Sequence, residues 1–441
     1  MTELQRTHQA APVEGPPEQP PLEVALLTWE YPPIPSAKGR VACEVAHGLA
    51  QHGANVRVFT MDREDRVRTD NERIEVIGCA NRITGLRRLM GHVPGLDHIA
   101  AAAAFRERVH EEHDRRPFDL IEAANHRAPA AMLMDCGLPM VIRNGSPYAL
   151  DAAEQSGTLN RLSAAVASGL EARCVAKSDA VISNSRAHAG MIKDWYDIKP
   201  GHFHQVTPLS VSPGLDRQGR KAPYPPAHAK LRMARIGNAS IRSGFTETLL
   251  GFDETLRQLR TEGKALPELH LIGLQTGDLE HVLDILDLDA ETPAQIFNHG
   301  RLPDHAMGHV LARCHFVIAA SRYQSFGSVY HEAAAFGRPL IACAEDPIAR
   351  DFIRRHDCGV MADACTPEEI ARTVLALFED REMQLACRHA GLEHAATWSR
   401  EALGARTIQA YRRAMNLSEI ELPGLKPARE TGLVRNRYAR G

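Results

Sequence analysis

The chain has 441 residues, enough for two or three domains of ordinary size, and its 44% apolar and 24% charged residues are typical of soluble globular proteins. A formal charge of -3 gives no sign of a nucleic-acid partner, and no apolar run approaches the roughly 18 residues of a membrane-spanning helix. With nine scattered cysteines and no signal-peptide pattern at the N-terminus, we expect a cytoplasmic protein with reduced thiols.

The predicted elements begin after a polar, proline-rich stretch at 1–21, which we expect to be a disordered lead-in. The apolar run Glu23–Thr28 suits a buried parallel strand. A helix is predicted over about Arg40–His52 and ends at Gly53, and Ala54–Thr60 predicts the next strand. This strand–helix–strand order is typical of a parallel sheet.

The same alternation continues on both sides of a looser, proline-rich stretch. Three further strands are predicted before it, at Phe118–Glu122, Pro139–Ile142 and Ala180–Ser183. Five are predicted after it, at Met233–Ile236, Leu269–Ile272, Phe316–Ala319, Pro339–Ala342 and Gly359–Met361. The last predicted helices are Thr366–Phe378, Arg381–His394 and Arg400–Met415. Two successive α/β series predict two doubly wound, Rossmann-like domains that face a cleft.

These patterns give a complete domain plan. It consists of a first domain at 22–210, a linker at 211–230, a second domain at 231–397, a crossing helix at 398–418 and a basic, flexible tail at 419–441.

The most informative segment is Ser321–Pro339, which reads Ser-Arg-Tyr-Gln-Ser-Phe-Gly-Ser-Val-Tyr-His-Glu-Ala-Ala-Ala-Phe-Gly-Arg-Pro. It follows a predicted strand, turns at Gly327 and continues as a helix. Such a turn places free amides beside the positive end of the helix dipole, which favours an anionic ligand such as a pyrophosphate. Glu332 follows about one helical turn later, where a carboxylate can accept hydrogen bonds from ribose. A helix start that simply needs Gly327 for its turn remains an alternative.

The segment resembles family 4 of the retaining glycosyltransferases, whose run reads Ser-x-x-Glu-x-Phe-Gly-x-x-x-x-Glu-Ala-x-x-x-Gly-x-Pro. The resemblance covers about residues 23–415. It implies a GT-B fold whose C-terminal helices cross back toward the first domain, a nucleotide-diphosphate sugar as co-substrate, and neither a cofactor nor a bound metal. The matching residues are Ser321, Phe326, Gly327, Glu332, Ala333, Gly337 and Pro339.

The resemblance also implies roles on the donor side. Glu332 would bind the ribose, and the amides of the run Phe326–Ser328 (Phe326, Gly327 and Ser328) would hold the diphosphate. The family has two acids eight residues apart, but here the first position is Gln324, which brings no charge to the sugar. Gln324 and Ser325 would contact the sugar.

A second departure concerns the cations that clamp the leaving diphosphate in the family. Gly237, counted here as donor-binding, is followed by Asn238 at the family's Arg position and by Ser243 at its Lys position. Arg242 is adjacent and is predicted to supply the charge. Charge neutralisation of a leaving group is often a large catalytic effect, so these changes put full activity in doubt.

The loop after the first strand is altered as well. The family's Gly-Gly corresponds to Ser36 and Ala37, which precede Lys38, Gly39 and Arg40. A cation at Lys38 or Arg40 would partly replace the missing clamp from across the cleft. The alternative is a solvated lysine and a helix-start arginine.

On the acceptor side, predicted strand ends carry polar residues that face the cleft. Asn125 and His126 follow one strand, and Asn144, where the family often has a histidine, precedes Gly145 after another. His126 is a candidate to act near the acceptor, although a satisfied surface histidine is the more ordinary interpretation.

The sequence therefore predicts a glycosyltransferase that moves a sugar to a glycan, lipid-linked or small-molecule acceptor with retention of configuration. One alternative is a catalytically impaired GT-B protein that is a binding or scaffold partner of another transferase. Another keeps the fold but cleaves or epimerises a nucleotide sugar. The basic, apolar stretch Arg82–Met90 could contact the inner face of the membrane or a lipid-linked acceptor, and an ordinary amphipathic surface is the alternative. A monomer and a homodimer both suit the fold.

Overall fold

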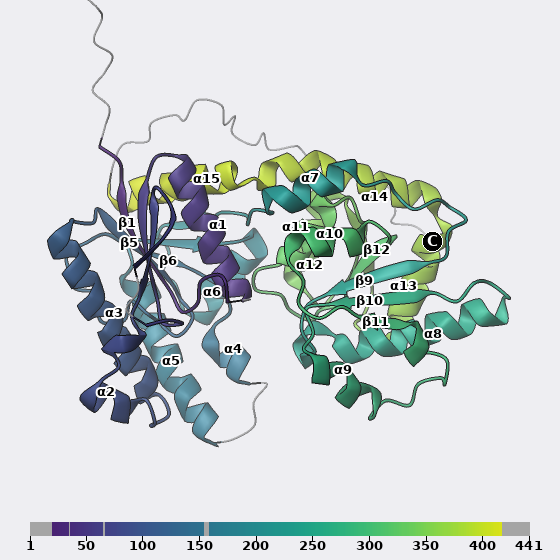
Figure 1. The fold of residues 1–441 in the computed structure, drawn as a ribbon, viewed down its shortest axis with the longest axis horizontal. Helices are drawn as coiled ribbons and strands as arrows, with labels where there is room; N and C mark the ends of the chain where they lie inside the picture. The colour runs from purple at the N-terminus through teal and green to yellow at the C-terminus, as the bar shows by residue number, and fades with distance from the viewer. Residues whose placement is uncertain (1–19, 35, 65–66, 154–157, 417–441) are drawn as a thin grey trace, which may run out of the picture.

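The computed structural model describes residues 20–34, 36–64, 67–153 and 158–416. The lead-in predicted at 1–21 lies outside this range apart from residues 20 and 21, and the tail predicted at 419–441 lies wholly outside it. The protein consists of two α/β domains that lie side by side (Figure 1). No helix within the described residues has the length and apolar character needed to cross a membrane.

The first domain is built on an eight-stranded sheet. Its strands are β1 (Glu23–Thr28), β2 (Asn55–Thr60), β3 (Val67–Asn71), β4 (Ile74–Gly78), β5 (Leu120–Ala124), β6 (Met140–Arg143), β7 (Ala180–Ser183) and β8 (His204–Val206). Its helices are α1 (Ala37–Gln51), α2 (Gly85–Met90), α3 (Leu96–Arg115), α4 (Tyr148–Ala152), α5 (Thr158–Lys177) and α6 (Arg186–Trp195). The strand order is β3-β4-β2-β1-β5-β6-β7-β8, parallel throughout except for the β3–β4 pair.

The second domain is built on a six-stranded, fully parallel sheet. Its strands are β9 (Arg232–Ile236), β10 (Glu268–Ile272), β11 (Ile296–Asn298), β12 (Phe316–Ala319), β13 (Leu340–Cys343) and β14 (Gly359–Ala362). Its helices include α8 (Phe245–Thr261), α9 (Thr276–Leu283), α10 (Asp304–Leu311), α11 (Ser328–Ala335), α12 (Pro347–His356), α13 (Pro367–Glu379) and α14 (Arg381–His394). The order β11-β10-β9-β12-β13-β14 is the doubly wound order of dinucleotide-binding folds. The predicted fold class is thereby confirmed.

Most of the predicted strands are buried on both faces, although the predicted edge strand β14 is only partly buried. Separate clusters of apolar side chains cover the two faces of each sheet, so central strands such as β1 and β12 read as continuous apolar runs. The prediction did not include β3, β4, β8 and β11. Of these, β3, β8 and β11 lie at sheet edges, and four of the five residues in the β3 run Val-Arg-Thr-Asp-Asn are charged or polar. Such strands lack the apolar signature of a buried strand.

The stretch predicted as a linker is partly helical, because Ser212 caps and Pro213 starts helix α7 (Pro213–Lys221). Helix α7 packs against α10 and α11 of the second domain. Three arginines of that domain then bind the carbonyls of the following residues. Arg388 donates to Ala222 at 2.8 Å, Arg338 to Pro223 at 3.0 Å and Arg381 to Pro225 at 2.8 Å.

The last helix, α15 (Arg400–Ala414), returns to the first domain and packs along α1 (Figure 1). Arg400 pairs with both carboxylate oxygens of Glu44 at 2.6 and 2.7 Å, and the Tyr411 hydroxyl donates to Glu122 at 2.7 Å. The predicted crossing of the C-terminal helices is therefore present. It leaves the carboxyl ends of the two sheets facing each other, which is where doubly wound folds bind their ligands.

Candidate active site

The loop between β12 and α11 forms the second-domain wall of the site. Gly327 takes the left-handed conformation at φ +60° as the residue before α11, and a Cβ there would lie 3.0 Å from the Tyr330 ring. The half-buried Ser328 is the first residue of α11. The first amides of this helix have no intrahelical partner, so they are available to donate hydrogen bonds to an anion.

Glu332 is reached from the opposite domain. It is 7% exposed on α11, and its Oε1 accepts a hydrogen bond from Arg40 Nη1 of α1 at 2.8 Å. Arg40 also lies 3.5 Å from Asp304. Burial raises the pKa of Glu332 above its ordinary value even though Arg40 opposes the shift. The predicted ribose-binding carboxylate is therefore engaged by one of the two cations predicted from across the cleft.

Ser325 and Phe326 touch the first domain directly. The Ser325 hydroxyl contacts that of Ser146, and the Ser325 carbonyl accepts from Asn184 Nδ2 at 3.2 Å. The Phe326 ring lies against Gly145 so closely that a Cβ on Gly145 would sit 2.4 Å from it. Gly145 is thus needed for the approach of the two domains.

The amide of Gln324 is turned toward its own loop, where Nε2 donates to Ser321 Oγ at 2.7 Å. Behind it, the Tyr330 hydroxyl donates to Asp346, whose Oδ1 also accepts from the Ile348 amide at 2.9 Å. Burial raises the pKa of Asp346 to about 6 against these hydrogen bonds. This network fixes the loop that carries Gln324.

The two positions at which the family has its diphosphate-binding cations, Asn238 and Ser243, lie in the segment between β9 and α8. Gly237 has φ +142°, Asn238 is exposed, and the Ser243 hydroxyl lies 2.6 Å from Arg235 Nη2. Arg235 also donates to the Asn238 carbonyl at 2.9 Å, so it supports this loop from within the domain. Burial lowers the pKa of Arg235 to about 10, against the raising effect of Glu247.

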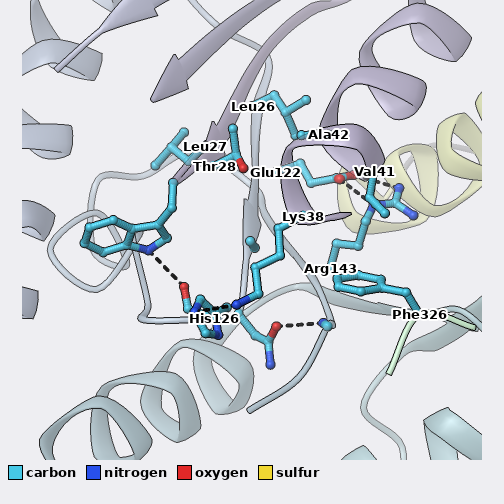
Figure 2. Close-up of a pocket in the computed structure, with 14 residues that line it drawn as sticks. Leu26, Leu27, Thr28, Lys38, Val41, Ala42, Glu122, His126, Arg143 and Phe326 are labelled. Carbon is cyan, nitrogen blue, oxygen red and sulfur yellow. Dashed lines mark hydrogen bonds and ion pairs between the residues drawn. The ribbon is translucent and has the colours of Figure 1, made fainter. Parts of the chain in front are cut away.

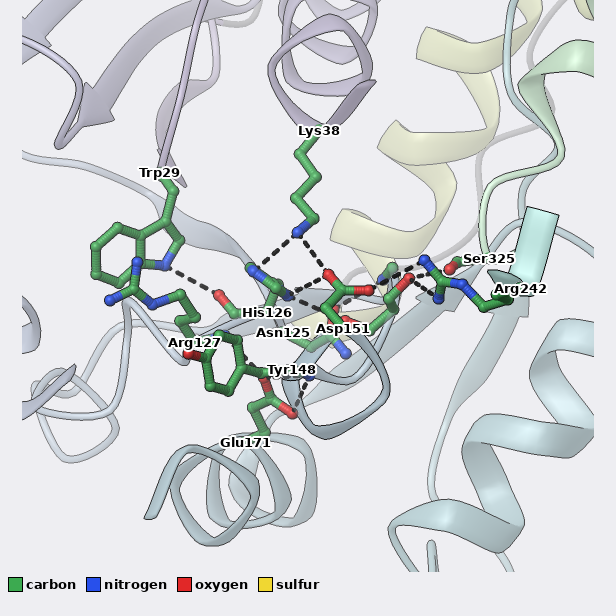
Figure 3. A network of polar contacts seen from close by, with 12 residues as sticks. Trp29, Lys38, Asn125, His126, Arg127, Tyr148, Asp151, Glu171, Arg242 and Ser325 are labelled. Atoms are coloured by element: carbon green, nitrogen blue, oxygen red, sulfur yellow. Dashed lines mark hydrogen bonds and ion pairs between the residues drawn. The ribbon is translucent and has the colours of Figure 1, made fainter. Parts of the chain in front are cut away.

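Arg242 reaches across the cleft. Its Nη2 lies 3.2 Å from Asp151 Oδ1 and its Nη1 3.4 Å from Ser146 Oγ, both in the first domain. Lys38 approaches the same carboxylate from α1, with Nζ 2.9 Å from Asp151 Oδ2. The cations predicted at 38 and 242 therefore converge on one point, as Figure 3 shows.

The loop that holds Lys38 is partly a helix start. Ser36 caps α1 by accepting from the Gly39 amide at 3.2 Å, so the helix begins at Ala37, earlier than the predicted Arg40. A Cβ on Gly39 would lie 3.0 Å from the Glu30 carbonyl. Lys38 sits in the first turn and is paired, so the alternative of a solvated lysine is wrong.

His126 is satisfied but not at the surface, because it is 8% exposed. Its Nε2 accepts from Lys38 Nζ at 2.8 Å, and its Nδ1 lies 3.3 Å from the Ser146 carbonyl. Burial, reinforced by Lys38, lowers the pKa of His126 to about 3. The imidazole is therefore neutral, with its proton on Nδ1. The surface interpretation of His126 is corrected by this burial.

Asn125 and Asn144 hold the backbone in place. Asn125 Oδ1 accepts from the Gly145 amide at 2.8 Å, and its Nδ2 donates to Tyr196 at 3.1 Å. Asn144 Nδ2 donates to the Ile182 carbonyl at 3.2 Å. Both side chains are fully buried. They orient the strand ends beside the cleft.

A pocket opens between these strand ends, the start of α1 and the ring of Phe326 (Figure 2). Trp29 forms one side and donates from Nε1 to the His126 carbonyl at 3.0 Å. The lining residues are Leu26, Leu27, Thr28, Trp29, Lys38, Val41, Ala42, Glu122, Ala124, Asn125, His126, Arg143, Gly145 and Phe326. Within the described residues, no group of three or more His, Cys, Asp or Glu side chains is arranged to hold a metal.

Three residues of this network were missed by the sequence analysis: Ser146, Asp151 and Glu171. Ser146 directly follows the singled-out Gly145 in the loop between β6 and α4, whereas Asp151 and Glu171 lie on α4 and α5, which carry no motif. Only their tertiary contacts reveal them.

Two Rossmann-like domains whose sheets face each other across a cleft are the arrangement of the GT-B fold. Residues 39–208 match the model of Glycosyltransferase Family 4, and residues 252–394 match that of Glycosyl transferases group 1. These two matches, one in each domain, confirm the resemblance to a family 4-type glycosyltransferase with the GT-B fold.

Similar proteins agree with this assignment. A D-inositol 3-phosphate glycosyltransferase of Segniliparus rotundus is 27% identical over 56% of the chain and 54% of its own length. The chain therefore spans about half the length of that relative. Sucrose-phosphate synthase from Thermosynechococcus elongatus superposes with a TM-score of 0.69 at 16% identity, over 90% of this chain and 99% of that one. Anabaena HepE, in complex with UDP and glucose, gives 0.58 at 15% identity over 88% and 99%. The two structural likenesses concern the fold.

Proposed function

We propose that the protein transfers a sugar from a nucleotide-diphosphate sugar to an acceptor hydroxyl with retention of anomeric configuration. The observation that carries this proposal is the convergence of Lys38 and Arg242, from opposite domains, on one carboxylate. They are joined in the cleft by the free amides at the start of α11. Facing cations and helix amides together suit a diphosphate.

In this proposal Lys38 and Arg242 neutralise the charge that develops on the leaving diphosphate, in place of the cations that the family has at 238 and 243. Glu332 accepts hydrogen bonds from the ribose once Arg40 releases it. Gln324 contacts the sugar as a neutral hydrogen-bonding group. We assign no nucleophile.

The acceptor is proposed to enter from the first domain, through the pocket beside Trp29 and His126. The relatives named D-inositol 3-phosphate glycosyltransferase make that cyclitol phosphate the first acceptor to test. Glycan and lipid-linked acceptors follow in the same assay.

The test is thermal stabilisation by UDP, GDP, ADP and their sugar conjugates. A ligand at a hundred times its Kd stabilises the native state by about 2.7 kcal/mol. We expect one nucleotide to stabilise the wild type and Glu379→Ala, an exposed carboxylate of α13, but not Glu332→Ala. Stabilisation by none of them would leave the scaffold role as the better account.

We also propose a peripheral membrane contact, on a separate observation. Six large apolar side chains stand exposed at one end of the first domain, on α2, in the loop between α2 and α3, and at the beginnings of α3 and α5, and we name them the apolar patch. They are Leu86, Leu89, Val93, Leu96, Leu159 and Leu162. Arg88 and Arg161 are exposed among them and have no acidic partner in the part of the chain that the structure describes. Exposed apolar side chains with cations among them are suited to bind an anionic lipid surface.

A further inference from the structure

The carboxylate on which the cleft cations converge belongs to the chain itself. Asp151 lies on α4, a short helix of the first domain that follows the β6 strand end. Its two oxygens are divided between the domains, since Oδ2 accepts from Lys38 at 2.9 Å and Oδ1 lies 3.2 Å from Arg242. Figure 3 shows Asp151 between the two cations, with His126 beside them.

Asp151 is an anion in this setting. Burial alone would raise its pKa, but the charges of Lys38 and Arg242 and the hydrogen bond from Lys38 outweigh that effect and hold the pKa below its ordinary value. Since His126 is neutral, the cluster holds two cations and one anion. The carboxyl group of Glu171, on the same domain, is instead hydrogen-bonded to Arg127, Tyr148 and Tyr196.

The same pattern occurs at the third cation of the cleft, because Arg40 is paired with Glu332 at 2.8 Å. All three cations predicted to bind the donor are therefore held by carboxylates of the chain. A diphosphate carries more negative charge than one carboxylate and has more acceptor oxygens, so it can replace Asp151 as the partner of both Lys38 and Arg242.

We propose that Asp151 is an internal counter-ion of the donor site, which holds Lys38 and Arg242 in the empty cleft and gives them up to the diphosphate of the nucleotide. This inference rests on the proposed function. Without such a counter-ion, two cations facing each other across the cleft would repel and would attract any passing anion. A ligand must therefore carry more negative charge than one carboxylate to displace Asp151 from the two cations.

The proposal makes Asp151 a residue that weakens diphosphate binding, which is the reverse of what a ligand-binding residue does. We expect Asp151→Asn to lower the Kd for the nucleoside diphosphate by about tenfold, because the ligand no longer has to displace an anion. The Kd for the matching nucleoside, which has no phosphate, should stay unchanged. Binding should also depend more steeply on salt in the variant, since its cations are no longer neutralised.

The experiment is isothermal titration calorimetry, which measures the Kd of the full chain for UDP, GDP and ADP, for their nucleosides and for inorganic pyrophosphate. Asp363→Asn is the matched control, because Asp363 pairs with Arg372 at 3.0 Å on an exposed surface outside the cleft. Asp151→Ser repeats the test without an amide that could take over the two contacts, and circular dichroism verifies that each variant is folded.

An equal or higher Kd for the diphosphate in both folded Asp151 variants would overturn the inference. If the wild type binds a nucleotide in that case, the proposed function survives without it. If neither the wild type nor the variants bind any nucleotide or pyrophosphate, both proposals fail. If only the Asp151 variants bind, the inference is supported in its strongest form.

Discussion

At the scale of single residues, Glu171 is the buried group on which the acceptor side of the site depends. Its carboxylate accepts from the amides of Arg127 at 2.7 Å and Tyr148 at 3.1 Å, and from the Tyr196 hydroxyl at 2.8 Å. Arg127 and the next residue, Ala128, have positive φ of 56° and 42°, a conformation that is strained for residues other than glycine. Glu171 thus stabilises the turn next to His126 and the start of the helix that carries Asp151.

Glu171 should make stability depend on pH. Burial raises its pKa from 4.5 to about 7 in spite of these hydrogen bonds. Between these values the folded chain keeps a proton that the unfolded chain has lost. The contribution of Glu171 to the free energy of unfolding is therefore fully present below pH 4.5. It is lost as the pH rises through about 7, a decrease of about 3 kcal/mol.

Glu171→Gln removes this titration. We expect the difference in free energy of unfolding between wild type and variant to shift by about 3 kcal/mol in favour of the variant from pH 4.5 to pH 8. Urea unfolding across that range measures it. A difference that stays constant with pH would show that Glu171 does not titrate there.

At the scale of elements, the contact between α1 and α15 attaches the crossing helix to the first domain. It depends on two glycines, because a Cβ on Gly404 would lie 2.1 Å from the Gly48 carbonyl and one on Gly48 would lie 2.7 Å from the Arg400 carbonyl. The helices approach backbone to backbone at this point. The Arg400–Glu44 pair then fixes their register.

Gly404→Ala should therefore destabilise the protein by about 1–3 kcal/mol, because the added methyl group forces the two helices apart. Gly169→Ala on α5 is the control, since a Cβ there meets nothing within 4 Å. Its free energy of unfolding should be unchanged or higher by up to about 1 kcal/mol, as alanine favours helix. Equal effects of the two substitutions in urea unfolding would contradict the close approach.

At the scale of the whole molecule, the apolar patch gives the first domain one distinct end. The beginnings of α3 and α5 are in contact there, since His98 Nε2 lies 3.0 Å from Ser163 Oγ and a Cβ on Gly95 would meet the Val166 side chain. Helix α2 has no buried residue. Its two leucines, Leu86 and Leu89, are 73% and 67% exposed and so contribute little to the core.

We expect the protein to co-sediment with vesicles that contain an anionic lipid, and less with purely zwitterionic ones. Leu86→Ser combined with Leu89→Ser should reduce binding about tenfold or more, because each leucine contributes about 1.5–3 kcal/mol when buried. The control is Ile285→Ser with Leu385→Ser, two exposed apolar residues of the second domain. Equal binding by both double variants would reject the membrane contact, and a change of oligomeric state with the first alone would assign the patch to a protein interface.

Much of the fold follows from local sequence. Continuous apolar runs such as Phe316–Ala319 predict strands that are buried on both faces, and Gly327 with Glu332 marks the donor loop, because strand–turn–helix geometry needs particular residues at short spacing. The family and the order of the domains are determined at this level. The helix α7 within the linker was not predicted, since the prolines that indicate a linker also start helices.

Which charged side chains pair with each other in the cleft was decided only by the tertiary structure. Lys38 and Asp151 are 113 positions apart, and Arg40 and Glu332 are 292 positions apart, so no spacing in the sequence relates them. These pairs form because parallel sheets bring all their carboxyl ends to one edge, and because α15 returns to hold the two edges face to face. The sequence by itself determined which cations are available near the donor loop, and the packing of the two domains determined that each of them meets a carboxylate of the same chain.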